Sequence, residues 1–321
     1  MDSINLKGQN VLLTRVLTVW FGRACINSLK QRNAIICPVY HDNFDLLKEI
    51  DVYKAFAFWQ PDYVIHLAGF NGNISFNDQY PSDIFFRTTQ MGLNVLDKCR
   101  KWDVKKVVSA LTSCAYSPSD EPLKEEDFLV GIPHKSVEAH GLAKRNIFTY
   151  GKLLNHQYKR NICCSGLFNT AYGPFDNFNP DKTKVVGSFI TKFLEAIEEK
   201  KDTINFIGSG DTRREFIYCT DAADGLVQIL EKYDDYTLPL NIGFGTDLLI
   251  KDLAAKIAKL VGFVGEIKWG ENKEMIGQPR KILNCERMKK FNININKTSL
   301  DNGLIKTIAW YKNIYGKWKK N

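Results

Sequence analysis

Short apolar segments alternate with segments of helical periodicity along the first half of the chain, and this alternation constrains the fold more than any other feature. The expected strands are residues 9–13, 34–39, 63–69, 106–111 and 162–167. The expected helices are residues 23–32, 52–59 and 85–102, and a further helix is expected to begin at Lys144. Apolar strands joined by helices predict an α/β fold, a doubly wound parallel sheet with its topological switch point beside the first strand.

The pattern becomes less regular after about residue 180, where short strands and helices replace the longer segments. An amphipathic helix is expected at 185–200, followed by a strand and turn at 203–210. We therefore expect a larger domain at residues 1–179, which also receives segments from 204–240. A smaller α+β domain is expected at 180–321, partly interleaved with the first.

The composition is that of a soluble globular chain, with 44% hydrophobic and 25% charged residues among 321. No apolar run approaches the roughly 20 residues of a membrane helix, and the first residues carry an acid and no apolar signal core. The eight cysteines are scattered without paired metal spacing, so we expect reduced thiols, no metal and a cytoplasmic location. The net charge of +8 favours an anionic partner such as a nucleotide-diphosphate sugar, but the basic residues are too dispersed to indicate nucleic acid.

The segment after the fourth expected strand carries groups suited to chemistry. Residues 106–111 deliver Thr112 and Cys114 to the carboxyl end of a strand, where ligands bind in an open parallel sheet. Lys144 follows on a helix, so a hydroxyl, a thiol and a lysine are expected in one cleft. A cysteine at a strand end is by itself more often a buried structural thiol, but Thr112 and Lys144 favour a catalytic position. We expect an electropositive pocket beside Lys144 to lower the pKa of the Cys114 thiol.

Five sequence blocks are typical of one family. They are residues 66–68 (His-Leu-Ala), 113–114 (Ser-Cys), 143–145 (Ala-Lys-Arg), 172–178 (Tyr-Gly-Pro-Phe-Asp-Asn-Phe) and 208–216 (Gly-Ser-Gly-Asp-Thr-Arg-Arg-Glu-Phe). Together they resemble the GDP-L-fucose synthases, extended short-chain dehydrogenases/reductases that act on nucleotide sugars, over about residues 9 to 316. The resemblance implies a Rossmann-like fold whose larger domain binds a dinucleotide and whose smaller domain binds the substrate.

The resemblance also implies an activity and a set of site residues. Enzymes of this family convert a GDP-4-keto-6-deoxyhexose by 3,5-epimerisation, in which a thiol and a general acid exchange protons beside a ketone, and then reduce that ketone with NADPH. By position, catalytic roles are implied for Thr112, Cys114, His140, Lys144 and Lys184. Cofactor contacts are implied for Thr14, Gly22, Asp45, Ala68, Lys144 and Asn169, and substrate contacts for Lys192, Arg214 and Lys281. A homodimer is implied as well.

The choice of dinucleotide rests on the resemblance alone. Asp42 and Asp45 follow the second strand, where an acid hydrogen-bonds a cofactor ribose. No arginine stands there to favour a 2′-phosphate, so NADP is expected from the family and NAD stays open. In the smaller domain, the adjacent Arg213 and Arg214 are expected to need anionic partners.

Three positions depart from the family's pattern. His140 stands where the tyrosine of a Tyr-x-x-x-Lys motif is expected; histidine donates a proton near neutral pH, but from a different place than a phenol. Lys184 stands where the family has a catalytic histidine, and Lys192 where it has a substrate-binding arginine. Both lysines are equally compatible with solvated positions at the edges of a helix.

The stretch after the first strand departs most. The family has Gly-x-x-Gly-x-x-Gly there, which lets a helix N-terminus approach a pyrophosphate. Residues 14–22 instead read Thr-Arg-Val-Leu-Thr-Val-Trp-Phe-Gly, one residue too long, with Gly22 the one glycine left. With suitable codons, a two-base shift across residues 15–21 regenerates Gly-Val-Asn-Gly-Leu-Val before Gly22, so a compensated frameshift explains the stretch better than gradual drift.

The loss of the glycine loop leaves two functions open. Arg15 is able to form a salt bridge with a phosphate, which fits an active enzyme. The alternative is a catalytically impaired or inactive homologue that binds a nucleotide sugar or partners an active subunit.

Overall fold

The structure is a computed structural model that describes residues 3–15, 20–179, 182–270 and 278–318. The central part of the anomalous stretch, residues 16–19, lies outside the described residues, and so does the frameshift interpretation that depends on it. Among the described residues, no helix is long and apolar enough to cross a membrane.

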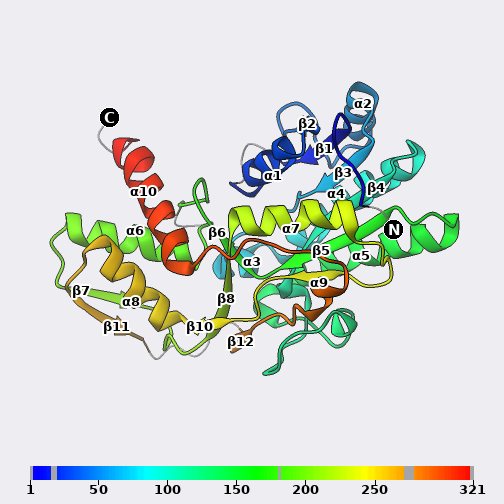
Figure 1. Ribbon diagram of the computed structural model, residues 1–321. Coiled ribbons are helices and arrows are strands. Elements are labelled where there is room, and N and C mark those ends of the chain that lie inside the picture. The colour runs from blue at the N-terminus through cyan, green and yellow to red at the C-terminus, as the bar shows by residue number, and fades with distance from the viewer. Residues whose placement is uncertain (1–2, 16–19, 180–181, 271–277, 319–321) are drawn as a thin grey trace.

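A six-stranded parallel sheet forms the larger part of the molecule (Figure 1). Its strands are β1 (Asn10–Thr14), β2 (Ile35–Val39), β3 (Tyr63–His66), β4 (Lys106–Thr112), β5 (Cys163–Phe168) and β9 (Leu240–Ile242). The spatial order β2-β1-β3-β4-β5-β9 reverses direction at β1, because β2 lies on one side of it and β3 on the other. The predicted doubly wound sheet and its switch point beside the first strand are confirmed.

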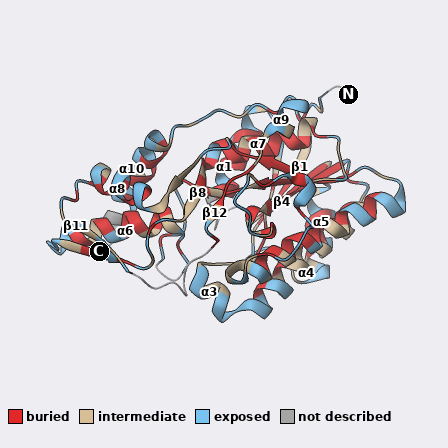
Figure 2. Ribbon diagram, turned by 90° about the horizontal axis from the view of Figure 1, so that it is seen from below, coloured by how far each residue is buried: buried red, intermediate tan, exposed pale blue. Residues whose placement is uncertain are grey.

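Helices cover both faces of this sheet. One face packs against α2 (Glu49–Trp59), α4 (Pro81–Lys101) and α5 (Glu138–Tyr158), and the other against α1 (Trp20–Gln31) and α7 (Cys219–Lys232). Along β1, the side chain of Leu12 packs in the core on the α2, α4 and α5 face, while Val11 and Leu13 pack in the core on the α1 and α7 face. Alternate side chains of a strand point to opposite faces, so one short apolar run serves two cores. Figure 2 shows the resulting buried layer between exposed helix surfaces.

Helix α5 begins earlier than predicted, at Glu138 instead of Lys144. Gly141 has a low helix propensity, so the turn before Lys144 carries a weak helical signal in the sequence. The structure shows why a glycine is present: a Cβ there would lie 2.6 Å from the carbonyl oxygen of Cys114. The earlier start places His140 and Lys144 on successive turns of one helix, packed against the end of β4.

The smaller part of the molecule contains two further sheets. In one, β8 (Arg213–Tyr218) pairs with β6 (Thr170–Tyr172), β10 (Asp247–Leu249) and β12 (Arg280–Lys281); in the other, β7 (Thr203–Phe206) pairs with β11 (Glu266–Trp269). Its helices are α6 (Val185–Glu198), α8 (Ile250–Val261) and α10 (Leu300–Trp318). Two short helices lie with the larger part: α3 (Ile74–Gln79), beside the start of α4, and α9 (Glu286–Lys290), beside β9. Helix α7 and strand β9 return to the large sheet (Figure 1). The boundary near residue 180 stays a prediction.

Candidate active site

The thiol of Cys114 lies at the carboxyl end of β4, in a single turn of 3-10 helix at Ser113–Ala115. The hydroxyl of Thr112 accepts a hydrogen bond from the backbone N–H of Cys114 over 3.2 Å and so caps this turn. Ser113 is buried, and its hydroxyl donates to Oδ1 of Asn169 over 2.9 Å. The cap and the serine bond fix the direction in which the half-buried Cys114 points.

The cation beside this thiol is Lys281, from the distant strand β12. Its Nζ donates to Cys114 Sγ over 3.4 Å. Burial raises the pKa of the Cys114 thiol, but Lys281, the hydroxyl of Thr112 and the ammonium of Lys184 outweigh burial and bring the pKa below its usual value. The predicted electropositive pocket is present, and the cations that lower the thiol pKa are Lys281 and Lys184 instead of Lys144.

Lys144 is buried on α5 and joins two strands of the large sheet. Its Nζ donates to the carbonyl oxygens of Ala68, after β3, and Ala110, in β4, over 3.2 and 2.9 Å. Burial, followed by the nearby guanidinium of Arg15, lowers the pKa of Lys144 to about 7. The ammonium is therefore held in place and close to losing its proton at neutral pH.

His140 lies one turn before Lys144 and is only 7% exposed. Burial lowers the pKa of His140 well below its usual value, and the charges of Lys144, Lys184 and Arg15 lower it further. The imidazole is thus neutral at pH 7 and cannot serve as the near-neutral acid expected of a solvated histidine. Its Nε2 lies 3.3 Å from the side-chain amide nitrogen of Asn71, and its buried Nδ1 has no hydrogen-bond partner in the described part of the chain. With the Asn71 amide donating, the ring proton is on Nδ1.

The expected substrate-binding residues come from the smaller part of the molecule. Arg214 faces Lys281 across the β8–β12 pair, and its charge interacts with Cys114. Lys184, at the N-terminus of α6, is exposed, and its charge lowers the pKa of both Cys114 and His140, so it lies near both groups. Lys192 is also exposed, with its Nζ 5.3 Å from the centre of the Phe206 ring, and among the described residues it contacts neither Cys114 nor His140.

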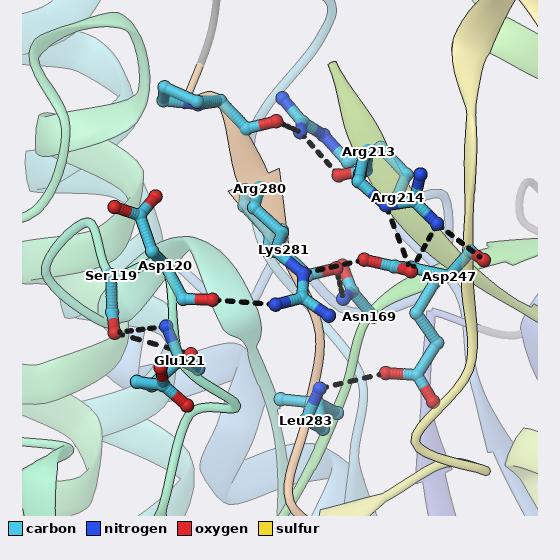
Figure 3. A network of polar contacts seen from close by, with 12 residues as sticks. Ser119, Asp120, Glu121, Asn169, Arg213, Arg214, Asp247, Arg280, Lys281 and Leu283 are labelled. Atoms are coloured by element: carbon cyan, nitrogen blue, oxygen red, sulfur yellow. Dashed lines mark hydrogen bonds and ion pairs between the residues drawn. The ribbon is translucent and has the colours of Figure 1, made fainter. Parts of the chain in front are cut away.

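The two adjacent arginines of β8 differ in their partners. Arg213 has an internal one, Asp247, whose carboxylate also binds Arg280, over 2.9 and 2.8 Å respectively (Figure 3). Arg214 donates to the carbonyl oxygens of Arg213 and Pro279 and pairs with no carboxylate among the described residues. The expected anionic partner of Arg213 is thus Asp247, inside the fold. Of the two arginines, Arg214 is the one whose charge is available for a ligand.

A cavity of about 300 Å³ opens at the switch point of the sheet. It is lined by Arg15, Asp42, Asp45, Ala68, Gly69 and Arg87, among others. The Asp45 carboxylate accepts from the backbone N–H of Leu47 over 3.1 Å, which fixes it at the cavity. Sequence reasoning missed Arg87: it comes from α4, far along the chain from the acids, and no local motif marks it.

The remaining cofactor candidates have contacts inside the fold. The hydroxyl of Thr14 accepts hydrogen bonds from the backbone N–H groups of Leu67 and Ala68 over 2.9 and 3.2 Å. Gly22 lies in the first turn of α1. Asn169 donates from Nδ2 to the carbonyl oxygen of Lys281 over 2.8 Å, in addition to its bond with Ser113. Their roles toward a cofactor stay predictions.

Arg15 occupies a backbone conformation that favours glycine. Its φ is 61°, in the left-handed region where the expected first glycine of the loop would lie without strain. The guanidinium lines the cavity, is half-buried and has no hydrogen bond or ion pair with any described residue. Because no described residue pairs with it, this guanidinium is available to an anionic group of a ligand.

His140 also lines a second cavity, of about 450 Å³. Its walls come from α3, the start of α4, the segment before α5 and the first turns of α5, and include Asn77, Phe85, Lys135, Ser136 and Leu142.

The large sheet is parallel and has a cavity at its switch point. A His-x-x-x-Lys pair lies on α5, and a cysteine follows the carboxyl end of β4. These features define a Rossmann-type protein of the extended short-chain dehydrogenase/reductase class. The chain belongs to the NAD dependent epimerase/dehydratase family, whose model matches residues 16–243.

Individual relatives narrow this class. The chain is 31% identical over 287 residues to a GDP-L-fucose synthase of Sinorhizobium fredii, covering 89% of this chain and 90% of the relative. It is 29% identical over 300 residues to the GDP-L-fucose synthase of Escherichia coli, covering 90% and 92%. The crystal structure of a GDP-L-fucose synthetase from Naegleria fowleri bound to NADP superposes with a TM-score of 0.87 at 25% identity, covering 98% of both chains. The resemblance drawn from the sequence blocks is confirmed.

Proposed function

We propose that this protein is an NADP-dependent nucleotide-sugar epimerase and reductase that converts a GDP-4-keto-6-deoxyhexose by 3,5-epimerisation and 4-reduction. One observation carries the proposal: the charges of Lys281 and Lys184 act on both Cys114 and His140, and Lys144 lies one turn after His140 and binds the strand that leads to Cys114. Relatives with the same fold over nearly the whole chain, named as GDP-L-fucose synthases, support the choice of substrate.

The cavity at the switch point fits a phosphorylated dinucleotide. Asp42 and Asp45 offer carboxylates for ribose hydroxyls, and Arg15 and Arg87 offer guanidinium groups for phosphates. When bound, NADPH would supply the hydride for reduction. The two arginines support NADP over NAD, although neither follows the second strand directly.

Epimerisation needs a base against the carbon next to the ketone. The Cys114 thiolate accepts that proton, and the electrons of the C–H bond move into the carbonyl group. His140 donates a hydrogen bond from Nδ1–H to the carbonyl oxygen as negative charge develops there. Lys184, near both groups, returns a proton to the carbon, which completes the inversion.

Reduction needs a proton at the ketone oxygen. A neutral imidazole is a weak acid, so His140 polarises the oxygen but does not protonate it efficiently. Lys144, whose pKa is about 7, holds a transferable proton beside it. The two residues together replace the tyrosine and lysine of the family's motif.

The reaction is tested with the full chain, NADPH and a GDP-4-keto-6-deoxyhexose in deuterium oxide. We expect deuterium at C3 and C5 of the sugar and oxidation of NADPH. An inactive homologue would incorporate no deuterium and oxidise no cofactor. The cavity and the intact thiol pocket favour the enzyme over that alternative.

We also propose a homodimer, and a cytoplasmic location in line with eight unpaired cysteines. Helices α4 and α5 lie side by side and expose large apolar side chains, with Phe86 61% and Leu153 56% accessible. A second copy covering these helices would remove that surface from water. Light scattering of the wild type and of Phe86→Glu distinguishes a dimer from a monomer.

A further inference from the structure

Cys114 differs in its electrostatic environment from the seven other cysteines. Burial raises the pKa of each of the other thiols, namely Cys25, Cys37, Cys99, Cys163, Cys164, Cys219 and Cys285. Among the residues that the structure describes, Cys114 is the one cysteine with a hydrogen bond from an ammonium, that of Lys281, over 3.4 Å. A specific contact therefore sets this thiol apart from the rest.

Lys281 is 8% exposed and held in place by its backbone. Its residue pairs with Arg214 in the parallel β8–β12 ladder, and its carbonyl oxygen accepts from Asn169 Nδ2 over 2.8 Å. Asn169 in turn accepts from the hydroxyl of Ser113, the residue before Cys114. Two hydrogen bonds through the Asn169 side chain thus connect Ser113, next to Cys114, to the backbone of Lys281.

The charge of Lys281 needs a counter-ion. A buried ammonium is costly unless an anion or several acceptors compensate it. In the described part of the chain, Lys281 Nζ has no carboxylate partner, and Cys114 Sγ is its one hydrogen-bond acceptor. Its neighbour across the ladder, Arg214, adds positive charge. A thiolate at Cys114 supplies the missing negative charge; a neutral thiol does not.

We propose that Lys281 is a positioning residue that holds Cys114 as a thiolate in the free protein, so that the base for epimerisation is ready before substrate binds. When the pair forms, the thiol proton leaves to solvent and Lys281 stays protonated. In the reaction the thiolate sulfur takes the proton of the C–H bond, the bonding electrons move into the ketone, and Lys281 keeps its charge. The use of the thiolate as a base rests on the proposed function; the pair itself does not.

This role differs from a contact to the substrate alone. A lysine that only binds a phosphate would change KM and leave the ionisation of Cys114 as it is. A lysine that pairs with the thiolate changes the pH at which the thiol ionises, even with no ligand present. The two roles are therefore separable in the ligand-free protein.

The test is the rate of Cys114 alkylation by iodoacetamide from pH 5 to 10, with no cofactor or substrate and with the labelled peptide identified by mass spectrometry. In the wild type we expect the midpoint below about 8.5, the ordinary value for cysteine. In Lys281→Met the midpoint should rise by at least one pH unit, so that alkylation at neutral pH slows roughly tenfold. Lys281→Arg, which keeps the charge, should restore most of the rate.

The control is Lys256→Met, which removes an exposed lysine paired with Asp301, and should leave the profile unchanged. A wild-type midpoint at or above the ordinary value overturns the proposal without any variant, as does an unshifted midpoint in a folded Lys281→Met. Epimerisation with an unshifted midpoint would reject the pair and keep the proposed function. A shifted midpoint without epimerisation would keep the pair and reject the proposed function.

Discussion

Lys144 donates a hydrogen bond over 2.9 Å to the carbonyl oxygen of Ala110, in the strand that carries Cys114 to the site. The same ammonium binds the carbonyl oxygen of Ala68, after the neighbouring strand. Lys144 thereby fixes the ends of β3 and β4 relative to α5. Its ammonium group is buried. Its ionisation is thus coupled to stability as well as to catalysis.

The first prediction concerns this coupling. The pKa of Lys144 is about 7 in the folded chain and near 10.4 in the unfolded chain. Between these values the unfolded chain binds more protons, so this residue makes folding more favourable as pH rises from 7 toward 10. The free energy of unfolding of the wild type, relative to Lys144→Met, should rise by about 2 kcal/mol between pH 7 and 9. Urea unfolding at several pH values measures it; a constant difference would contradict the lowered pKa.

His140→Tyr should raise the rate of reduction. The neutral imidazole of His140 is a poor acid, whereas a phenol next to Lys144 is able to donate its proton. General acid catalysis contributes roughly 100- to 10,000-fold, so a gain toward the lower end of that range is expected. NADPH oxidation at saturating substrate gives the rate, and His140→Phe serves as the matched control that should be slower than the wild type. Equal rates for histidine and tyrosine with a slower phenylalanine variant would mean that histidine is already competent, and equal rates for all three would mean that the residue does not act on the ketone.

Restoring the glycine loop should tighten NADPH binding. Replacing residues 15–21 by Gly-Val-Asn-Gly-Leu-Val puts glycine at the position where Arg15 has a φ of 61°. A non-glycine residue in this region costs roughly 1–2 kcal/mol, and bulky side chains keep a helix N-terminus away from a pyrophosphate. A fluorescence titration should show at least about a tenfold lower dissociation constant for the repaired chain. Unchanged affinity would show that Arg15 already compensates for the lost glycines.

Arg87 should select NADPH over NADH. Its guanidinium lines the cavity that also holds Asp42 and Asp45, and it stacks over the Phe70 ring at 4.5 Å. Arg87→Ala should weaken NADPH binding roughly tenfold, the loss of one charge-assisted hydrogen bond, and leave NADH binding nearly the same. Arg100→Ala, on the same helix but paired with Asp97, is the control. Equal weakening of both cofactors would place Arg87 away from the 2′-phosphate.

Cys114→Ser should separate the two halves of the proposed reaction. Proton abstraction beside the ketone needs the thiolate, while hydride transfer needs the proton donor and the cofactor. Deuterium exchange into the sugar should therefore fall at least about 100-fold, while direct reduction of the unepimerised 4-ketone persists. Nuclear magnetic resonance of the sugar and NADPH oxidation measure the two activities separately. An equal loss of both in a folded variant would make Cys114 a structural residue.

The sequence by itself determined the doubly wound sheet, its switch point and the family. Buried parallel strands read as continuous apolar runs such as residues 106–111, and family blocks such as Ser113-Cys114 are local in the chain. Local signals of this kind survive without knowledge of the fold. The start of α5 was missed because Gly141 has a low helix propensity, and its close approach to Cys114 is a tertiary requirement.

Only the tertiary structure decided which charges meet. Lys281 lies 167 residues from Cys114 in sequence, yet it is the cation that contacts the thiol, because Asn169 binds both the backbone of Lys281 and the side chain of Ser113, next to Cys114. The same holds for Arg87 at the cofactor cavity and for the burial that keeps His140 neutral. Electrostatic interactions depend on distance and burial, and neither quantity is written in the local sequence.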